Sequence, residues 1–121
     1  MSNAISWFEL PANNFERAMK FYSDILGQYL QPMDHPDMKM AFFPTSNNGV
    51  GGCVTHGNGN KPQAEGTMVY LNGGENLSIP LARVEKAGGK VIMPKTPIGE
   101  NGFMAIIMDT EGNRVAFHSM N

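Results

Sequence analysis

The sequence predicts an α+β protein made of two tandem βαβββ modules that form a curved mixed sheet around a cleft. The first half contains one strand, one amphipathic helix and then three strands separated by turn residues. The second half repeats this plan, because a shift of 61 residues sets Trp7 on Met68 and Gly27 on Gly88. Each helix covers one face of its sheet, which leaves the other face free to line a cleft.

We assign the whole chain, residues 1–121, to a single domain, because this length is usual for one domain. Module 1 covers about residues 4–56, and module 2 covers about residues 66–121. Residues 57–65 form a polar linker between them. The spaced glycines near this linker open no helix, so they do not predict a phosphate-binding loop.

Module 1 begins with a strand at 4–10, which Pro11 ends because proline cannot donate to a strand ladder. Alternation places Trp7 and Glu9 on one face of this strand and Leu10 on the other. The following stretch, FERAMKFYSDIL, has apolar residues at helical spacing, and we expect this helix to cover the Leu10 face.

The helix of module 1 has signals at both ends. Asn13 or Asn14 is suited to cap its start, and Gly27 is suited to end it. The remaining strands of module 1 are predicted at 28–33, 39–43 and 50–55, between segments rich in turn residues.

Module 2 begins with a strand at 67–72, which places Met68, Tyr70 and Asn72 on one face. A helix is predicted at 76–87, with Pro80 in its first turn, where the missing N–H does little harm. The strand that starts at 91 is interrupted by two prolines and is therefore short or at an edge. The chain ends in an antiparallel hairpin over 102–119, whose turn reads DTEGN.

Composition limits the classes of partner. The chain is 41% hydrophobic and 17% charged, which is typical of a globular protein, and its net charge of −2 gives no basic footprint for nucleic acid. No stretch is long and apolar enough to span a membrane, and the first residues lack the pattern of a signal peptide. Cys53 is the single cysteine, so the sequence favours a reducing, cytoplasmic location.

The duplicated plan, with FERAMKFYSDILG in the first half and MDTEGNRVAFHS at the end, resembles the vicinal oxygen chelate superfamily over the whole chain. This superfamily includes glyoxalase I, extradiol dioxygenases, and fosfomycin- and bleomycin-resistance proteins. The resemblance implies a glyoxalase-like fold. For family enzymes it also implies a divalent metal, held on the cleft faces of the strands, that stabilises an anionic intermediate. An enzyme of this kind would resemble a lactoylglutathione lyase or a dioxygenase.

The positions that the resemblance assigns to metal ligands hold other residues here. They are Trp7 and Thr55 in module 1, and Met68 (or Val69) and Ala116 in module 2. These side chains offer no imidazole and no carboxylate, the groups from which catalytic metal sites are usually built. We therefore predict no metal cofactor and a protein that binds a small molecule in the cleft between its modules.

A displaced site is the alternative. His118 lies two residues past Ala116 and Glu9 two past Trp7, so both share the cleft face, and His56 ends the equivalent strand of module 1. Glu9, His56 and His118 could together hold Zn, Ni, Mn or Fe. In the more ordinary interpretation, which we favour, both histidines are strand-end residues that bind solvent or backbone.

The same face offers a metal-free alternative, a lyase, isomerase or dioxygenase-like enzyme with acid–base chemistry at Glu9 and His118. Burial beside Trp7 would suit Glu9 to act as a general base, whereas a position at the cleft rim would leave it hydrated. A third hypothesis is an interaction protein with a closed, vestigial cleft. In each case we expect a homodimer, because exposed sheet edges often pair between chains.

Six residues are predicted to contact the small molecule. Trp7 offers a flat ring for stacking, and the others offer polar groups on the cleft strands, although for each of them an ordinary place in the strand surface or core is the simpler interpretation. They are Trp7, Cys53, Thr55, Tyr70, Asn72 and Arg114.

Overall fold

The fold comes from a computed structural model that describes residues 3–57 and 59–121. In the first half of the chain its elements are β1 (Trp7–Pro11), α1 (Phe15–Leu26), β2 (Gln31–Asp34), β3 (Lys39–Phe42) and β4 (Gly51–His56). In the second half they are β5 (Tyr70–Asn72), α2 (Ser78–Leu81), β6 (Lys90–Pro97), the 3₁₀ helix η1 (Gly99–Asn101), β7 (Phe103–Met108) and β8 (Arg114–Ser119).

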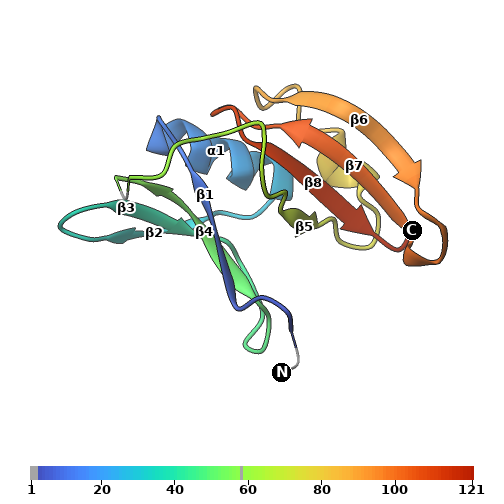
Figure 1. The fold of residues 1–121 in the computed structure, drawn as a ribbon, viewed down its shortest axis with the longest axis horizontal. Coiled ribbons are helices and arrows are strands. Elements are labelled where there is room, and N and C mark those ends of the chain that lie inside the picture. Colours follow the sequence, from blue (N-terminus) through green and yellow to red (C-terminus); the bar gives the residue numbers. More distant parts are fainter. Residues whose placement is uncertain (1–2, 58) are drawn as a thin grey trace.

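The strands form two four-stranded sheets with equivalent topology. The first has the order β1-β4-β3-β2 and the second the order β5-β8-β7-β6 (Figure 1). In each sheet the outer strand β1 or β5 pairs in parallel with the last strand of its half, and the other pairs are antiparallel. The predicted α+β class with a repeated strand plan is confirmed, with each half of the chain building its own sheet.

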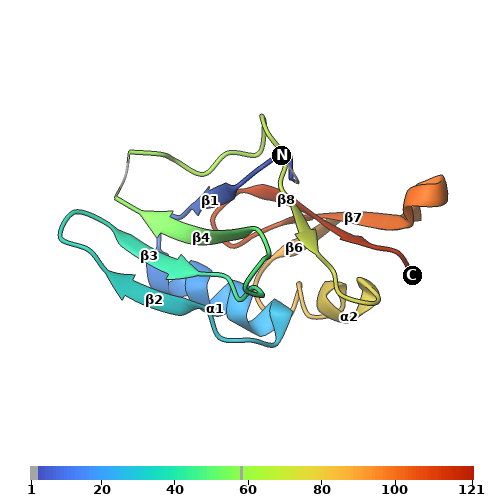
Figure 2. The ribbon, with the colours of Figure 1, turned by 90° about the horizontal axis from the view of Figure 1, so that it is seen from below.

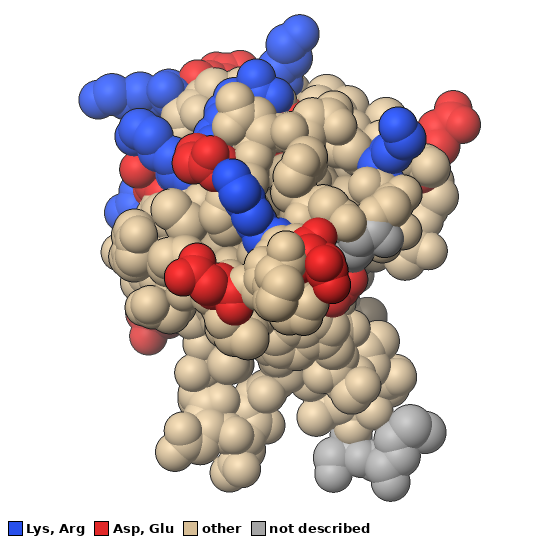
Figure 3. All heavy atoms as spheres, turned by 90° about the vertical axis from the view of Figure 1, so that its left-hand side faces the viewer, with Lys and Arg blue, Asp and Glu red and all other residues tan. Residues whose placement is uncertain are grey.

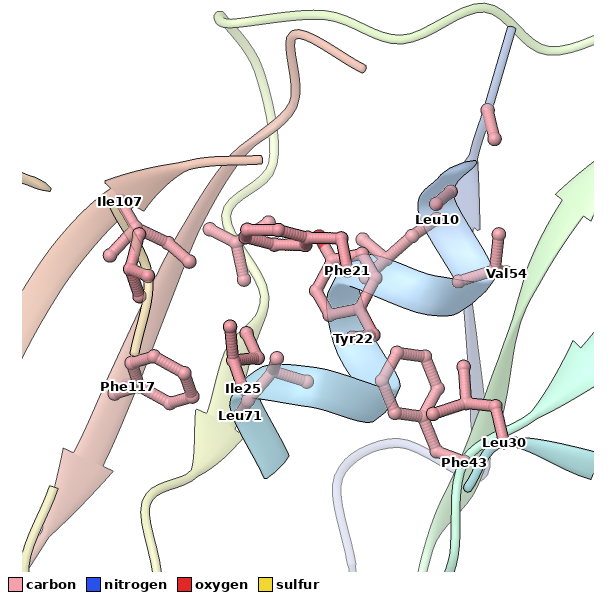
Figure 4. Packing of buried hydrophobic residues seen from close by; sticks show 14 of the residues in the cluster. Leu10, Phe21, Tyr22, Ile25, Leu30, Phe43, Val54, Leu71, Ile107 and Phe117 are labelled. Carbon is pink, nitrogen blue, oxygen red and sulfur yellow. The ribbon is translucent and has the colours of Figure 1, made fainter. Parts of the chain in front are cut away.

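Helix α1 lies between the two sheets and supplies the centre of the core. Its side chains Phe21, Tyr22 and Ile25 pack between Leu10 of the first sheet and Phe117 of the second (Figure 4). Figure 2 shows α1 and α2 on the same side of β1, β7 and β8. The expectation that α1 covers the Leu10 face is confirmed. The opposite face of each sheet, called here the outer face, carries the candidate site residues.

The ends of α1 follow the sequence signals. The side-chain oxygen of Asn14 accepts a hydrogen bond of 3.0 Å from the backbone N–H of Arg17, which satisfies one free donor of the first turn. Gly27 ends the helix in the left-handed conformation at φ 69°, which an L side chain rarely adopts.

The second half departs from the prediction in two elements. The helix expected at 76–87 is reduced to one α turn, Ser78–Leu81, followed by tighter turns in which Arg83 and Val84 donate to carbonyls three residues back. The strand expected at 67–72 begins only at Tyr70, although the carbonyl of Val69 still accepts from β8. Strand β6 is an edge strand, as expected, but it reaches eight residues, with Pro94 at an irregularity in the ladder and Pro97 at the end of the strand.

The turn between β7 and β8 is tied to α1 by buried polar groups. Asp109 accepts a hydrogen bond of 2.7 Å from the hydroxyl of Tyr22 in α1. Glu111 accepts from Arg17 Nε at 2.7 Å and from the backbone N–H of Asn14 at 2.7 Å. Burial and the neighbouring Asp109 carboxylate raise the pKa of Tyr22 well above its usual value, so this hydroxyl remains a donor. The DTEGN turn thus fixes α1 against the second sheet.

The Glu111 carboxylate should make stability depend on pH. Burial opposes its ionisation, but hydrogen bonds from Arg17, Asn14 and Thr110 outweigh burial and hold the pKa of Glu111 below its usual value. A lowered folded pKa stabilises the fold above the unfolded pKa, and this contribution is lost as the pH falls through the folded pKa. We expect the stability difference between wild type and Glu111→Gln in urea unfolding to be largest at neutral pH and to shrink below about pH 4. A difference that does not change with pH would contradict this assignment.

Candidate functional site: a cavity between the two halves

A cavity of about 1000 Å³ lies between the two halves of the chain. Strand β1 and the segment before it contribute Ile5, Trp7 and Phe8, and the opposite wall consists of residues 67–76, around β5. Ile79 and Arg83, from α2 and the turns that follow it, complete one end. The lining is largely apolar with a few polar groups, as is typical of small-molecule sites.

A smaller pocket of about 520 Å³ lies on the second sheet. It is lined by Tyr70 and Asn72 of β5 and by His118 of β8, three of the residues predicted for the site. Asn72 and His118 are direct partners in the strand register. His118 Nε2 lies 2.6 Å from the carbonyl oxygen of Asn101, and since a carbonyl only accepts, Nε2 carries the proton. The structure therefore brings Tyr70, Asn72 and His118 together in one pocket.

Glu9 lies on the outer face of the first sheet and is exposed. Its carboxylate accepts a hydrogen bond of 3.3 Å from Trp7 Nε1 and lies beside Cys53 in the register of β1 and β4. Glu9 is thus exposed rather than buried, and it lines neither pocket. Glu9 lies on the first sheet outside both pockets, whereas His118 lines the smaller pocket on the second sheet.

Cys53 is buried in β4, and burial together with the nearby Glu9 carboxylate raises the pKa of its thiol to about 11. Relative to the ordinary value of 9.0, this leaves roughly a hundredfold less thiolate at neutral pH. We expect Ellman's reagent to react with the native protein at least about a hundredfold more slowly than with protein in concentrated guanidinium chloride. Fast labelling of the native thiol would show instead that the outer face opens around Cys53.

Cys53 and the other two predicted contact residues, Thr55 and Arg114, lie outside both pockets. Thr55 is completely buried, and its hydroxyl oxygen is a buried side-chain atom without a hydrogen-bond partner among the described residues. Arg114 is exposed at the start of β8 and lines neither pocket. The predicted roles of Thr55 and Arg114 in ligand contact are therefore not supported by their positions.

The four positions compared with family metal ligands do not fit a metal. In the first sheet Trp7 pairs with Gly51 and Thr55 pairs with Pro11, so Trp7 and Thr55 lie four register positions, or about 13 Å, apart. In the second sheet Ala116 is buried beside Tyr70 rather than beside Met68. Of the four side chains only that of Thr55 offers an oxygen, and three protein ligands are the usual minimum.

The displaced metal site is not assembled in the single chain either. In the described part of the chain, no group of three or more His, Cys, Asp or Glu side chains is placed to hold a metal. His56 Nδ1 lies 2.7 Å from the carbonyl oxygen of Ala12, and His118 Nε2 contacts Asn101 in the same way. Both histidines thus use a ring N–H to bind backbone at a strand end, as the ordinary interpretation expects.

Two sheets of equivalent topology, packed around one helix with a cavity between the halves of the chain, define a duplicated βαβββ protein. The chain belongs to the Glyoxalase/Bleomycin resistance protein/Dioxygenase superfamily, whose family model matches residues 4–117. The resemblance stated from the sequence is thus confirmed. Among the described residues, none of the helices is long and apolar enough to cross a membrane.

Solved structures share this fold at low sequence identity. A variant of glyoxalase I from Zea mays has a TM-score of 0.72 at 21% identity over 94% of this chain, which spans only 45% of the maize chain. A glyoxalase-related enzyme from Fulvimarina pelagi has a TM-score of 0.69 at 14% identity, over 98% of this chain and 88% of its own. A glyoxalase/bleomycin resistance protein/dioxygenase family enzyme from Burkholderia phytofirmans PsJN has a TM-score of 0.69 at 10% identity, over 96% of this chain and 98% of its own. No curated protein matches this chain.

Several lining residues were not anticipated. Arg83 lies within the helix expected at 76–87 and Phe8 within the strand expected at 4–10, and neither was predicted to contact a ligand. Helical periodicity could not place Arg83, because the predicted helix unwinds into turns just before it.

Proposed function

We propose that this protein binds a small organic molecule in the cavity between its two halves and does so without the divalent metal of the family enzymes. The observation that supports this most is the cavity itself, whose volume of about 1000 Å³ suits a drug-sized ligand. Trp7, which is 45% exposed, and Tyr70, which is 52% exposed, offer aromatic faces along its walls. The replaced ligand positions Trp7, Thr55, Met68 and Ala116 support the metal-free part of the proposal.

Binding is tested with a neutral apolar dye, N-phenylnaphthylamine. Trp7 is the single tryptophan and lines the cavity, so energy transfer from Trp7 to the dye reports binding near this site. Ile79→Asp places a carboxylate on the apolar wall, and we expect it to weaken dye binding about tenfold. Ile92→Asp is the matched control, because Ile92 is similarly exposed (49% against 57%) but does not line the cavity. Absence of energy transfer, or equal effects of both variants, would contradict the proposal.

Metal content tests the second part of the proposal. After incubation of the tag-free protein with Ni²⁺, Zn²⁺, Mn²⁺ or Fe²⁺ and desalting, we expect elemental analysis to find only background metal. About one equivalent that is lost in Glu9→Ala or His118→Ala would overturn the proposal. It would favour a displaced centre formed in the assembled protein.

We further propose that the protein is a cytoplasmic homodimer without a nucleic-acid partner. Exposed apolar side chains on the first sheet, including Trp7 and Met33, favour contact with a second copy. The free thiol of Cys53 is compatible with a reducing compartment. On the face in Figure 3, Lys and Arg are interspersed with Asp and Glu, which does not favour nucleic acid. Light scattering coupled to size exclusion tests the dimer.

A further inference from the structure

The charged groups of the cavity indicate what kind of molecule it takes. Of the described residues that line it, only Arg83 and Glu75 carry a charge at neutral pH. Glu75 lies in the loop between β5 and α2, whereas Arg83 lies beside the end of α1. The rest of the lining consists of apolar side chains, small polar side chains and glycines, so these two groups set the electrostatic preference of the cavity.

Arg83 is held in a defined place. Its Nη1 donates to the carbonyl oxygen of Ile25 at 3.2 Å, in the last turn of α1. The guanidinium also lies directly over Gly27, where an added Cβ would come within 2.8 Å of Nη1. A cation at this position is favoured by the helix dipole, and no other basic residue occupies the last turn of α1.

This structural contact leaves most of the guanidinium unused. The group has five N–H donors, and the contact with Ile25 uses one of them. Within the described residues Arg83 forms no ion pair, and Glu75 forms none with it. By contrast, the guanidinium of Arg17 is bound on two nitrogens by Glu111. Arg83 therefore presents further N–H donors at the cavity, and no carboxylate among the described residues forms an ion pair with it.

The cavity that Arg83 lines also has apolar walls. Leu26 and Ile79 line the same cavity, and the aromatic side chains of Phe8, Trp7 and Tyr70 lie along its walls. A ligand that uses both features needs an apolar, preferably aromatic, body and one anionic group. Carboxylate, sulfonate and phosphate groups all match the planar donor fork of a guanidinium.

We propose that Arg83 makes the cavity selective for organic anions with an apolar body. The inference rests on the proposed function, because it names the ligand class of that same cavity. It adds a specificity residue on the cavity wall, distinct from the strand positions compared with the family metal ligands.

Two dyes with the same skeleton isolate the role of charge. Anilinonaphthalene sulfonate carries a sulfonate that N-phenylnaphthylamine lacks, and energy transfer from Trp7 localises both. For the wild type we expect the anionic dye to bind at least about tenfold more tightly than the neutral one. Arg83→Gln should remove this preference and leave the affinity for the neutral dye unchanged. Arg83→Lys should retain part of the preference for the anionic dye.

The controls separate the two proposals and the structural role of Arg83. Arg114→Gln removes an exposed arginine outside the cavity and should leave the affinity for both dyes unchanged. If Arg83→Gln loosens α1, the affinity for the neutral dye should change as well. Thermal unfolding shows whether this variant is less stable than the wild type. If the neutral dye fails to bind near Trp7, the proposed function fails. If it binds but the sulfonate gives no advantage, or Arg83→Gln and Arg114→Gln weaken the anionic dye equally, only the anion inference is overturned.

Discussion

Asp109→Ala should lower the free energy of unfolding by about 4 kcal/mol or more, a large part of the stability of a domain of this size. Asp109 is 4% exposed and accepts four hydrogen bonds, from the Tyr22 hydroxyl, the backbone N–H groups of Glu111 and Asn113, and the Asn113 side chain. The substitution removes the acceptor and leaves these buried donors without partners. Each unpaired buried donor costs about 1–3 kcal/mol, and water entering the new space recovers part of this loss.

Two comparisons show whether the loss comes from the unpaired donors. Tyr22→Phe removes one donor and leaves Asp109 with three hydrogen bonds, so we expect a loss of only about 1–1.5 kcal/mol. Asp24→Ala breaks the exposed pair with Lys20 in α1 and should cost less than about 0.5 kcal/mol. Urea unfolding with a common slope measures all three variants. A loss in Asp109→Ala no larger than that in Tyr22→Phe would contradict the proposed role of Asp109.

Much of the fold could be predicted from local signals in the sequence. Asn14 and Gly27 mark the ends of α1 because a cap and a left-handed residue are local requirements. The repeat between the two halves predicted the equivalent strand orders of the sheets. The short α2 was missed because the apolar spacing around Pro80 fits a helix as well as a series of tighter turns.

The candidate site was harder to predict, because it depends on register and on contacts between the halves. Alternation grouped Tyr70 with Asn72 and placed His118 on the same strand face as Ala116, but that these three side chains line one pocket follows from the pairing of β5 with β8. The resemblance assigned Trp7 and Thr55 to ligand positions, whereas the register of β1 and β4 separates these residues by four positions. Arg83 could not be found from sequence, since its place depends on the end of α1, far away along the chain.

Gly102→Ala, directly before β7, should lower the free energy of unfolding by about 3 kcal/mol or more. Gly102 has φ +97°, and a Cβ added there would overlap the backbone carbonyl of Ser119 and approach Met120 Cα to 2.8 Å. Gly112 is the matched control, because its φ of +98° is nearly the same but a Cβ there would meet nothing within 4 Å.

The strain of an alanine at positive φ alone predicts that both variants lose the same free energy of unfolding, about 1–2 kcal/mol each. The backbone clash adds a further loss in Gly102→Ala only. The clash also has a consequence at the site. Ser119 and Met120 line the smaller pocket, and His118 contacts Asn101, the residue before Gly102. We therefore expect Gly102→Ala, but not Gly112→Ala, to shift the ring resonances of His118 in NMR spectra of the folded protein. Equal urea midpoints and an unshifted His118 would show that the end of β8 yields easily, and that the smaller pocket is not held in a fixed shape by this turn.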